Sequence, residues 1–436
     1  MSKRIIATID VGSSKVTTVI ATLEEADARP TVIGVYSHPS QGIKKGVIVN
    51  IDEATNSISE SVTAAERMAG ITVSDVYVTI NGSSITSINN RGVVAVAGNE
   101  ITMDDTYRAI DNARTLTLPP NVNPIHILPR EFVVDSQAGI KYPIGMSGQR
   151  LEVETHIITA PVSAVKNLRK CVEQLGLNMY DIGFVGWASA KAVLTDTEKE
   201  LGVGMLDIGA GTTAITVFEE GAVTYSGVVP LGGENITSDI AIGLQVSLED
   251  AEKIKLNLDK IFEDQLKKVQ EEKKKPALLR AQEEKQEDDI DSEDMVDISA
   301  LGVSSKDKIS KSLLRKIIDA RLEEIFEMVK EEIKGAGFEL AIPAGMVVTG
   351  GTAQLRDITD VVQRVFDVPS RIGNPSGLTG MTEEISDPSF AAVQGLVKHA
   401  VTDDGGMGTE GGSGSRLAGA KNAISGVIDM LKSLMP

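Results

Sequence analysis

The sequence is poor in several residue types on which whole classes of protein depend. Its single cysteine, Cys171, excludes a disulfide framework and fits a reducing cytosol. Aromatic residues make up only 3% of the chain, too few to form the stacking platforms that bind single-stranded nucleic acid. We expect packing roles for Cys171 and for the single tryptophan, Trp187. The histidines are too scattered to predict a metal cluster, namely His38, His126, His156 and His399.

Positive charge and long apolar runs are also scarce. The chain has 43 basic and 62 acidic residues and a net charge of −19, which repels phosphate backbones and predicts no nucleic-acid partner. No apolar run reaches the roughly 18 residues that span a bilayer. The first ten residues lack the cleavage site of a signal peptide. We expect neither secretion nor a membrane-spanning helix, whereas attachment to a membrane surface stays open.

Two hairpins with the same pattern lie roughly 200 residues apart in a chain of 436 residues. The first passes through Asp10-Val-Gly-Ser-Ser-Lys15 and the second through Asp207-Ile-Gly-Ala-Gly-Thr-Thr213. In each, an apolar strand ends in an aspartate, small residues form a turn, and a β-branched strand follows. The repeat predicts two related α/β halves, within the two to four domains that the length indicates.

The two turns are suited to a phosphate chain, because glycine and small hydroxyl residues let backbone N–H groups approach phosphate closely. A single Asp-x-Gly turn is usually structural, but two copies in matching contexts favour a nucleotide site. Asp10 and Asp207, facing each other across a cleft, would suit a hydrated Mg²⁺. The turn residues expected at the phosphates are Gly12, Ser13, Ser14, Gly209, Gly211, Thr212 and Thr213.

Two further elements fit the rest of a nucleotide. Gly350 and Gly351 follow an apolar strand at 346–349, where backbone can pass close to a base or phosphate. Glu252 and Lys255 lie three residues apart on one helix face and could hold a ribose and flank a base. Such a pair alone is more often a surface ion pair.

The order of these elements resembles the actin–Hsp70–sugar-kinase superfamily, and nearly the whole chain is similar to the bacterial cell-division FtsA family. The similarity is carried by both turns and by the segments 229–240, 314–329 and 348–355. It implies an α/β, actin-like fold of two duplicated ribonuclease-H-like halves around a nucleotide cleft. An inserted small α+β subdomain and a C-terminal amphipathic helix complete that fold. The resemblance adds four residues to the expected nucleotide site, namely Lys15, Gly232, Gly233 and Gln354.

The resemblance also implies a function. The protein would bind ATP and Mg²⁺, bind the C-terminal tail of the tubulin-like protein FtsZ, and hold FtsZ polymers at the cytoplasmic face of the cell membrane at the division site. It would form actin-like filaments and contact other divisome proteins. The FtsZ surface would include roughly residues 296–325. Segment 186–189 lacks the carboxylate that hydrolysing relatives carry there, so we expect at most weak ATPase activity and assign no catalytic residue.

Two other classes of protein have the same kind of nucleotide-binding core and are the alternatives. An actin-like pilus-assembly protein would recruit an inner-membrane partner and typically lacks a tethered terminal helix. A sugar or acetate kinase would need a substrate domain with a base aspartate, for which residues 83–162 offer no convincing pattern.

The resemblance and the composition together predict a division of the chain. Residues 83–162 form the inserted module, whose strands we expect its prolines to interrupt, and the charged insertion 263–294 is expected to be solvated. The expected parts are 1–82 and 163–197 (first half), 83–162 (insert), 198–240 and 321–400 (core of the second half), 241–320 (its outer subdomain), 401–414 (linker) and 415–436 (terminal helix).

The terminal segment predicts a short, basic, amphipathic helix on a glycine-rich tether, which is typical of an interfacial membrane anchor. Docking on the protein's own core or on a partner is the alternative. The residues expected to face lipid are Arg416, Leu417, Lys421, Ile424, Val427, Ile428, Leu431, Lys432 and Leu434.

Overall fold

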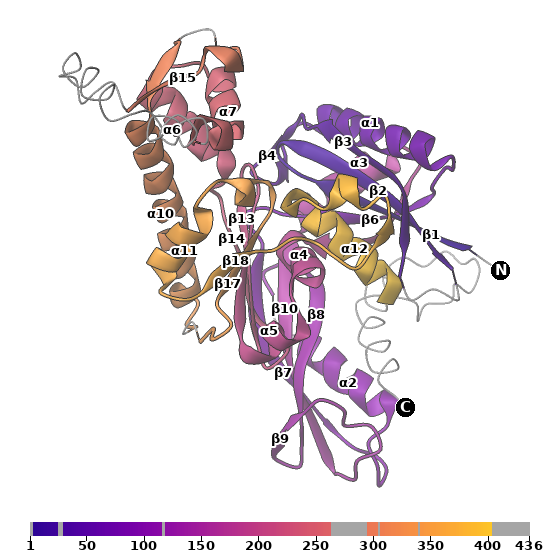
Figure 1. The fold of residues 1–436 in the computed structure, drawn as a ribbon. Coiled ribbons are helices and arrows are strands. Elements are labelled where there is room, and N and C mark those ends of the chain that lie inside the picture. Colours follow the sequence, from indigo (N-terminus) through magenta and orange to yellow (C-terminus); the bar gives the residue numbers. More distant parts are fainter. Residues whose placement is uncertain are drawn as a thin grey trace.

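The computed structural model describes residues 3–24, 29–115, 118–262, 294–303, 306–338 and 341–402. The predicted membrane helix at 415–436 lies outside the described residues, as do most of the predicted linker and of the charged insertion. The described chain is α/β, and two of its sheets share one topology (Figure 1).

The first half is built on a six-stranded sheet in the order β11-β6-β1-β2-β3-β19. Strands β1, β2 and β3 form an antiparallel meander, and β6 and β11 run parallel to β1. Helices α1 and α3 cover one face, and α12 covers the other (Figure 1). The strands are β1 (Lys3–Val11), β2 (Lys15–Glu24), β3 (Thr31–Pro39), β6 (Asp75–Ile80), β11 (Asn178–Phe184) and β19 (Thr379–Gly380). The helices are α1 (Ile51–Ala69), α3 (Val162–Glu173) and α12 (Ala391–Thr402).

Local sequence explains where the longest helix of this half begins and ends. The Asn50 side chain accepts hydrogen bonds from the backbone N–H groups of Asp52 and Glu53 and so caps α1. Gly70 ends the helix in the left-handed conformation, with φ of 70°. Between them Ile58 and Val62 are buried against the sheet.

The second half repeats the first on a five-stranded sheet in the order β14-β13-β12-β17-β18. Again three strands, β12, β13 and β14, form an antiparallel meander, and β17 and β18 run parallel to β12. The strands are β12 (Val203–Ile208), β13 (Thr213–Glu219), β14 (Ala222–Val229), β17 (Met346–Thr349) and β18 (Ser370–Ile372). The helices are α6 (Gly233–Leu244), α7 (Leu248–Leu256), α10 (Lys311–Gly335) and α11 (Ile358–Phe366), and a small outer sheet pairs β15 (Met295–Asp297) with β16 (Lys308–Ser310).

A separate four-stranded antiparallel sheet forms the insert, in the order β7-β10-β8-β9, and extends away from α7 and β15 (Figure 1). Contrary to expectation, Pro124 and Pro129 lie within β8 rather than between strands. The ladder with β10 shifts register at both prolines, which cannot donate a hydrogen bond to it. The elements are β7 (Thr86–Ala95), α2 (Met103–Arg114), β8 (Val122–Val134), β9 (Gln137–Ile140) and β10 (Arg150–Pro161).

The insert contacts the second half through a buried histidine. His156 of β10 lies between Asn89 of β7 and Ser226 of β14, with Nδ1 2.7 Å from Asn89 Oδ1 and Nε2 3.0 Å from Ser226 Oγ. Burial, helped by the positive charges of Arg130 and His126, lowers the pKa of His156 to about 3. The ring is therefore neutral when it bridges the two sheets.

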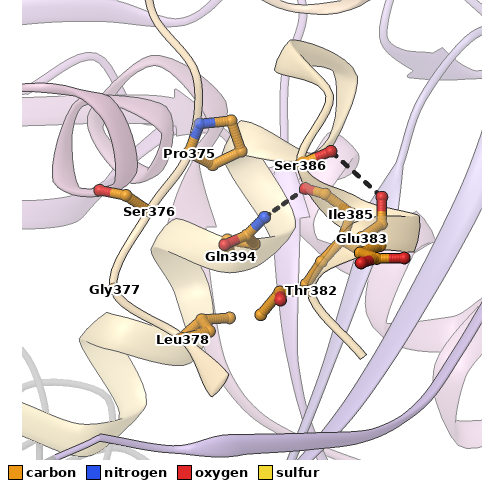
Figure 2. Close-up of a pocket in the computed structure, with 9 residues that line it drawn as sticks. All are labelled: Pro375, Ser376, Gly377, Leu378, Thr382, Glu383, Ile385, Ser386 and Gln394. Carbon is orange, nitrogen blue, oxygen red and sulfur yellow. Dashed lines mark hydrogen bonds between the residues drawn. The ribbon is translucent and has the colours of Figure 1, made fainter. Parts of the chain in front are cut away.

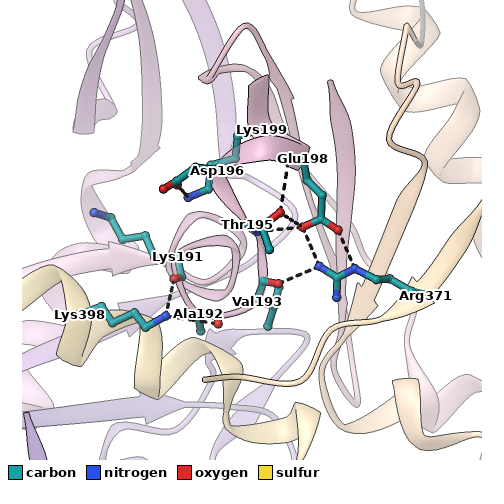
Figure 3. A network of polar contacts seen from close by, with 9 residues as sticks. All are labelled: Lys191, Ala192, Val193, Thr195, Asp196, Glu198, Lys199, Arg371 and Lys398. Carbon is teal, nitrogen blue, oxygen red and sulfur yellow. Dashed lines mark hydrogen bonds and ion pairs between the residues drawn. The ribbon is translucent and has the colours of Figure 1, made fainter. Parts of the chain in front are cut away.

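A network of polar contacts fixes the junction between the halves, formed by α4 (Val185–Val193) and α5 (Asp196–Leu201) (Figure 3). Arg371 of β18 donates to both carboxylate oxygens of Glu198, at 2.6 and 2.8 Å, and to the carbonyl of Val193 at 2.9 Å. Lys398 of α12 donates to the carbonyl of Lys191 at 3.1 Å. Cations from both halves thus pair with the last carbonyls of α4.

The starts of two helices depend on the element before them. Strand β11 ends at Phe184 and leads directly into α4, which begins at Val185. Gly350 is followed by a 3₁₀ turn, η2 (Gly351–Gln354), and α11 begins only at Ile358.

Candidate functional site

The two predicted hairpins are equivalent in register. Asp10 pairs with Thr17 across the first hairpin, and Asp207 pairs with Ala214 across the second, the same seven-residue step in both. Each turn is closed by one backbone hydrogen bond between its first and fourth residues. Gly12 donates to Lys15 at 3.1 Å, and Gly209 donates to Thr212 at 2.9 Å.

The turns approach each other across a cavity, and both aspartates line it. Burial, together with the negative charge of Asp10, raises the pKa of Asp207 to about 7. Burial also raises the pKa of Asp10. Two buried carboxylates that repel each other form a donor set that a divalent cation would stabilise.

A hydroxyl group orients each carboxylate. Thr79, on the strand next to β1, donates to Asp10 Oδ1 at 2.7 Å. Ser189, in the first turns of α4, donates to Asp207 Oδ2. No sequence pattern had singled out either hydroxyl, because both are distant in sequence from the aspartate that they contact.

Most of the predicted site residues come together at this cavity. Gly350 leaves space there because a Cβ at this position would lie 2.5 Å from Asp207 Oδ1, and its φ of 87° suits glycine. The predicted residues in the lining are Asp10, Gly12, Ser13, Ser14, Lys15, Asp207, Gly209, Gly211, Thr212, Gly350 and Gly351.

Six predicted residues are absent from that lining. Thr213 donates to the carbonyl of Leu231 at 2.9 Å, and Gln354 donates to Asp387 at 2.9 Å. The other four are Gly232, Gly233, Glu252 and Lys255.

Lys255 joins α7 to the start of α6. Its Nζ lies 2.7 Å from Glu252 Oε2 and donates to the Gly233 carbonyl at 3.2 Å. This group borders the second turn, since Thr352 donates to the Gly209 carbonyl at 2.9 Å and a Cβ on Gly233 would lie 2.5 Å from Thr352 Oγ1.

Sequence reasoning missed several residues in the lining. Asn81 donates to Thr212 Oγ1 at 3.0 Å, and Ser389 accepts a hydrogen bond from Lys15 at 2.8 Å. They carry no repeated motif and reach the cavity only through the fold. The other residues that were missed are Val11, Gly46, Val185, Ala210 and Ala392.

A second cavity, of about 320 Å³, lies between the segment 375–378 and the start of α12 (Figure 2). Its polar groups largely bond to one another. Gln394 donates to the Ile385 carbonyl at 2.6 Å, and Ser386 donates to the Glu383 carbonyl at 3.1 Å. It contains none of the predicted site residues.

Asp181 and His399 form a partly buried pair outside the cavity that the two turns line. His399 Nε2 lies 2.8 Å from Asp181 Oδ2, and Trp187 packs edge-on against the His399 ring. His126 also packs on Trp187, and its ring accepts a hydrogen bond from the Phe184 N–H at 2.9 Å. Among the described residues, no group of three or more His, Cys, Asp or Glu side chains could hold a metal ion.

Comparison with known proteins identifies the family. Residues 204–395 match the model of "Cell division protein FtsA", and residues 82–159 match "SHS2 domain inserted in FTSA". The chain is 37% identical to the cell division protein FtsA of Borreliella burgdorferi over 91% of each chain. It is 34% identical to that of Pseudomonas aeruginosa, over 92% of this chain and 90% of the relative. The chain belongs to the FtsA family.

Membership of the FtsA family makes this an actin-like cell-division protein. The predicted family and the α/β, actin-like fold with its insert are confirmed, whereas the predicted terminal helix lies outside the described residues. The Bacillus subtilis FtsA is 35% identical over 90% of this chain and 82% of its own length. The match to the inserted SHS2 domain agrees with the separate sheet of β7 to β10.

Solved structures share the fold at much lower identity. A PilM–PilN type IV pilus biogenesis complex matches with a TM-score of 0.59 and 15% identity, covering 91% of this chain and 98% of that chain. MreB5 of Spiroplasma citri bound to ADP matches with a TM-score of 0.50 and 14% identity, covering 92% of this chain and 97% of that chain. In the described part of this FtsA-family chain, no helix is long and apolar enough to cross a membrane.

Proposed function

We propose that the protein binds ATP with Mg²⁺ and tethers FtsZ polymers to the cytoplasmic face of the cell membrane. The observation that carries the nucleotide part is the matched register of the two hairpins, which places Asp10 and Asp207 at one cavity. The solved structure of MreB5, which shares the fold, is bound to ADP and so supports a nucleotide in this cavity.

The two turns would hold the phosphates, because residues of both turns and Lys15 line the same cavity. A Cβ on Gly211 would lie 3.0 Å from Ser13 Oγ, so this glycine keeps the cradle open. Mg²⁺ would be held near Asp10 and Asp207, where it would neutralise phosphate charge. The remaining phosphate-side residues of the proposal are Gly12, Ser14, Gly209, Thr212 and Thr213.

The adenosine would extend toward the second half. The Gly233–Lys255–Glu252 group borders the second turn there, which supports a role for the Glu252 carboxylate at the ribose hydroxyls. Gly232, Gly350, Gly351 and Gln354 complete this side of the proposal.

Turnover of ATP would be weak at most. Of the described residues that line the cavity, the carboxylates are Asp10 and Asp207, both proposed for the metal. Asp181 is paired with His399 and is not among the lining residues, so it is poorly placed to orient water. A turnover number near ~1 s⁻¹ would contradict this part of the proposal.

FtsZ would bind through its C-terminal tail at the outer subdomain, around residues 296–325. Apolar side chains in this subdomain are exposed to solvent: Ile242 of α6 is 74% exposed and Leu256 of α7 is 72% exposed. The proposal includes filament formation and contacts with other divisome proteins at the division site.

Co-sedimentation tests the tethering function. Anionic liposomes, FtsZ polymers and the full chain should pellet together. A variant that lacks residues 415–436 should no longer bind the liposomes but should still bind FtsZ polymers. Undiminished liposome binding by the deletion variant would overturn the membrane anchor. Calorimetry with Mg·ATP tests the nucleotide site, and no heat of binding would overturn it.

A further inference from the structure

A short hairpin with a two-residue loop, separate in sequence from both turns, also reaches the nucleotide cavity. Strands β4 (Ile43–Lys44) and β5 (Val47–Ile48) pair through Ile43 with Ile48 and Lys44 with Val47, leaving Lys45 and Gly46 at the tip. Both tip residues have positive φ, 48° and 74°, as the tightest hairpin turns require. We call residues 43–48 the tip hairpin.

The base of the tip hairpin is fixed to the core. Ile43 is 5% exposed and belongs to the core of the first half. The Gly42 carbonyl accepts hydrogen bonds from the N–H groups of Val49 and Asn50, at 2.8 and 3.1 Å, directly before α1. The tip is therefore held in place by a buried side chain and a helix start.

The tip contacts both turns. Gly46 N–H donates to Ser13 Oγ at 3.0 Å in the first turn, and Gly46 lines the cavity. On the other side, a Cβ on Gly211 would lie 3.0 Å from Lys45 Cα, so the second turn meets the tip backbone directly. The tip thus lies where the two turns converge.

We propose that the tip hairpin is a third phosphate-binding element, which makes the site selective for nucleoside triphosphates over diphosphates. This inference rests on the proposed nucleotide function. A phosphate held by both turns would lie between them, in the cavity that Gly46 also lines, and the Gly46 N–H already donates to Ser13 of the first turn. The Gly46 N–H passes from Ser13 Oγ to the terminal phosphate, to which the Ser13 hydroxyl also donates. A diphosphate leaves that position empty, and Gly46 stays on Ser13.

Hydrogen–deuterium exchange of the full chain with Mg²⁺ tests the idea without a substitution. Peptides covering 10–15 and 207–213 should exchange more slowly with either ADP or a non-hydrolysable ATP analogue. A peptide covering 43–48 should slow further only with the ATP analogue. Equal protection of 43–48 by both nucleotides overturns the tip assignment alone. If neither turn is protected by either nucleotide, the proposed function fails, and the tip assignment fails with it.

A substitution gives a second readout. A Cβ on Gly46 would lie 3.0 Å from Asn81 Cβ and from Gly82 N, so Gly46→Ala should move the tip away. We expect about tenfold weaker binding of the ATP analogue and ADP affinity within about twofold of the wild type. Gly70→Ala is the matched control, because Gly70 also has a positive φ, 70° against 74° at Gly46, but nothing lies within 4 Å of its Cβ position. Equal loss of both nucleotides by Gly46→Ala, or no loss of either, overturns the proposal.

Discussion

Lys15 Nζ donates a hydrogen bond to Ser389 Oγ at 2.8 Å and lies 4.1 Å from the centre of the Phe390 ring. This contact joins the turn of the first hairpin to η4 (Pro388–Phe390), which leads directly into α12. Burial lowers the pKa of Lys15, whereas the nearby Asp10 carboxylate opposes that change. The ammonium is thus already placed at the cavity by a residue 374 positions away in sequence.

Lys15→Ala should weaken Mg·ATP binding at least tenfold, because the phosphates lose a buried cation, a contact worth roughly 1.5–3 kcal/mol. Ser389→Ala is the matched control: it removes the partner of the ammonium but not the charge, and should change the affinity by less than about threefold. Isothermal titration calorimetry measures both. Similar losses in the two variants would show that Lys15 acts through packing rather than on phosphate.

Asp207→Asn should abolish the Mg²⁺ dependence of ATP binding and also stabilise the protein without nucleotide at pH 8. Because burial raises the folded-state pKa of Asp207 to about 7, the folded protein loses stability as pH rises from about 4 to 7. Asparagine carries no charge to bury, so the gain should be on the order of 2 kcal/mol at pH 8 and smaller at pH 5. Denaturant unfolding at both pH values is the measurement. Destabilisation at pH 8 would contradict this account of the carboxylate.

Lowering the pH should reduce the free energy of unfolding through two buried histidines. Burial lowers the pKa values of His126 and His156 to about 3, so their stabilising effect is complete above pH 6.5 and is lost as pH falls toward 3. Each should contribute a slope of about 1.4 kcal/mol per pH unit within that window. His156→Gln should reduce the slope by one such contribution in urea unfolding between pH 6.5 and 4.5. An unaltered slope for His156→Gln would show that the His156 ring is protonated in the fold.

The junction between the halves should depend on the planar geometry of one arginine. Arg371→Lys keeps the charge but loses the bidentate hydrogen bonding to Glu198. It should lower the free energy of unfolding by about 1–2 kcal/mol. Arg364→Lys is the control, since its pair with Glu323 has both side chains about half exposed and should be worth less than about 0.5 kcal/mol. Thermal and urea unfolding compare the two. Equal effects would mean that the network in Figure 3 contributes no more than a surface ion pair.

The repeated hairpins could be predicted because alternating β-branched residues and glycine turns are local signals. The sequence also predicted that Asp10 and Asp207 belong to one site, since two copies of one motif imply two equivalent positions. The hydroxyls of Thr79 and Ser189 could not be found this way, because a lone Thr or Ser on a strand or helix has no distinguishing pattern.

Other differences have equally physical causes. Gly46 joins the cavity only because the hairpin at 43–48 is anchored by distant core contacts. Pro124 and Pro129 were expected to interrupt strands, but a bulged ladder accommodates them without ending β8. The nucleotide-binding roles of Glu252, Lys255 and Gln354 stay predictions, as do the domain boundaries and the membrane helix.

Trp187 is the only tryptophan in the chain, and it lies in α4, where the two halves join. Its ring is in contact with His126 and His399, and the Lys191 ammonium lies 4.6 Å from the ring centre. The intrinsic tryptophan fluorescence of the protein therefore comes from this one position. Displacement of the neighbouring imidazole or ammonium groups would change the indole emission. A movement of α4 against α12 or against the insert can therefore be followed optically in the native chain, with no attached dye.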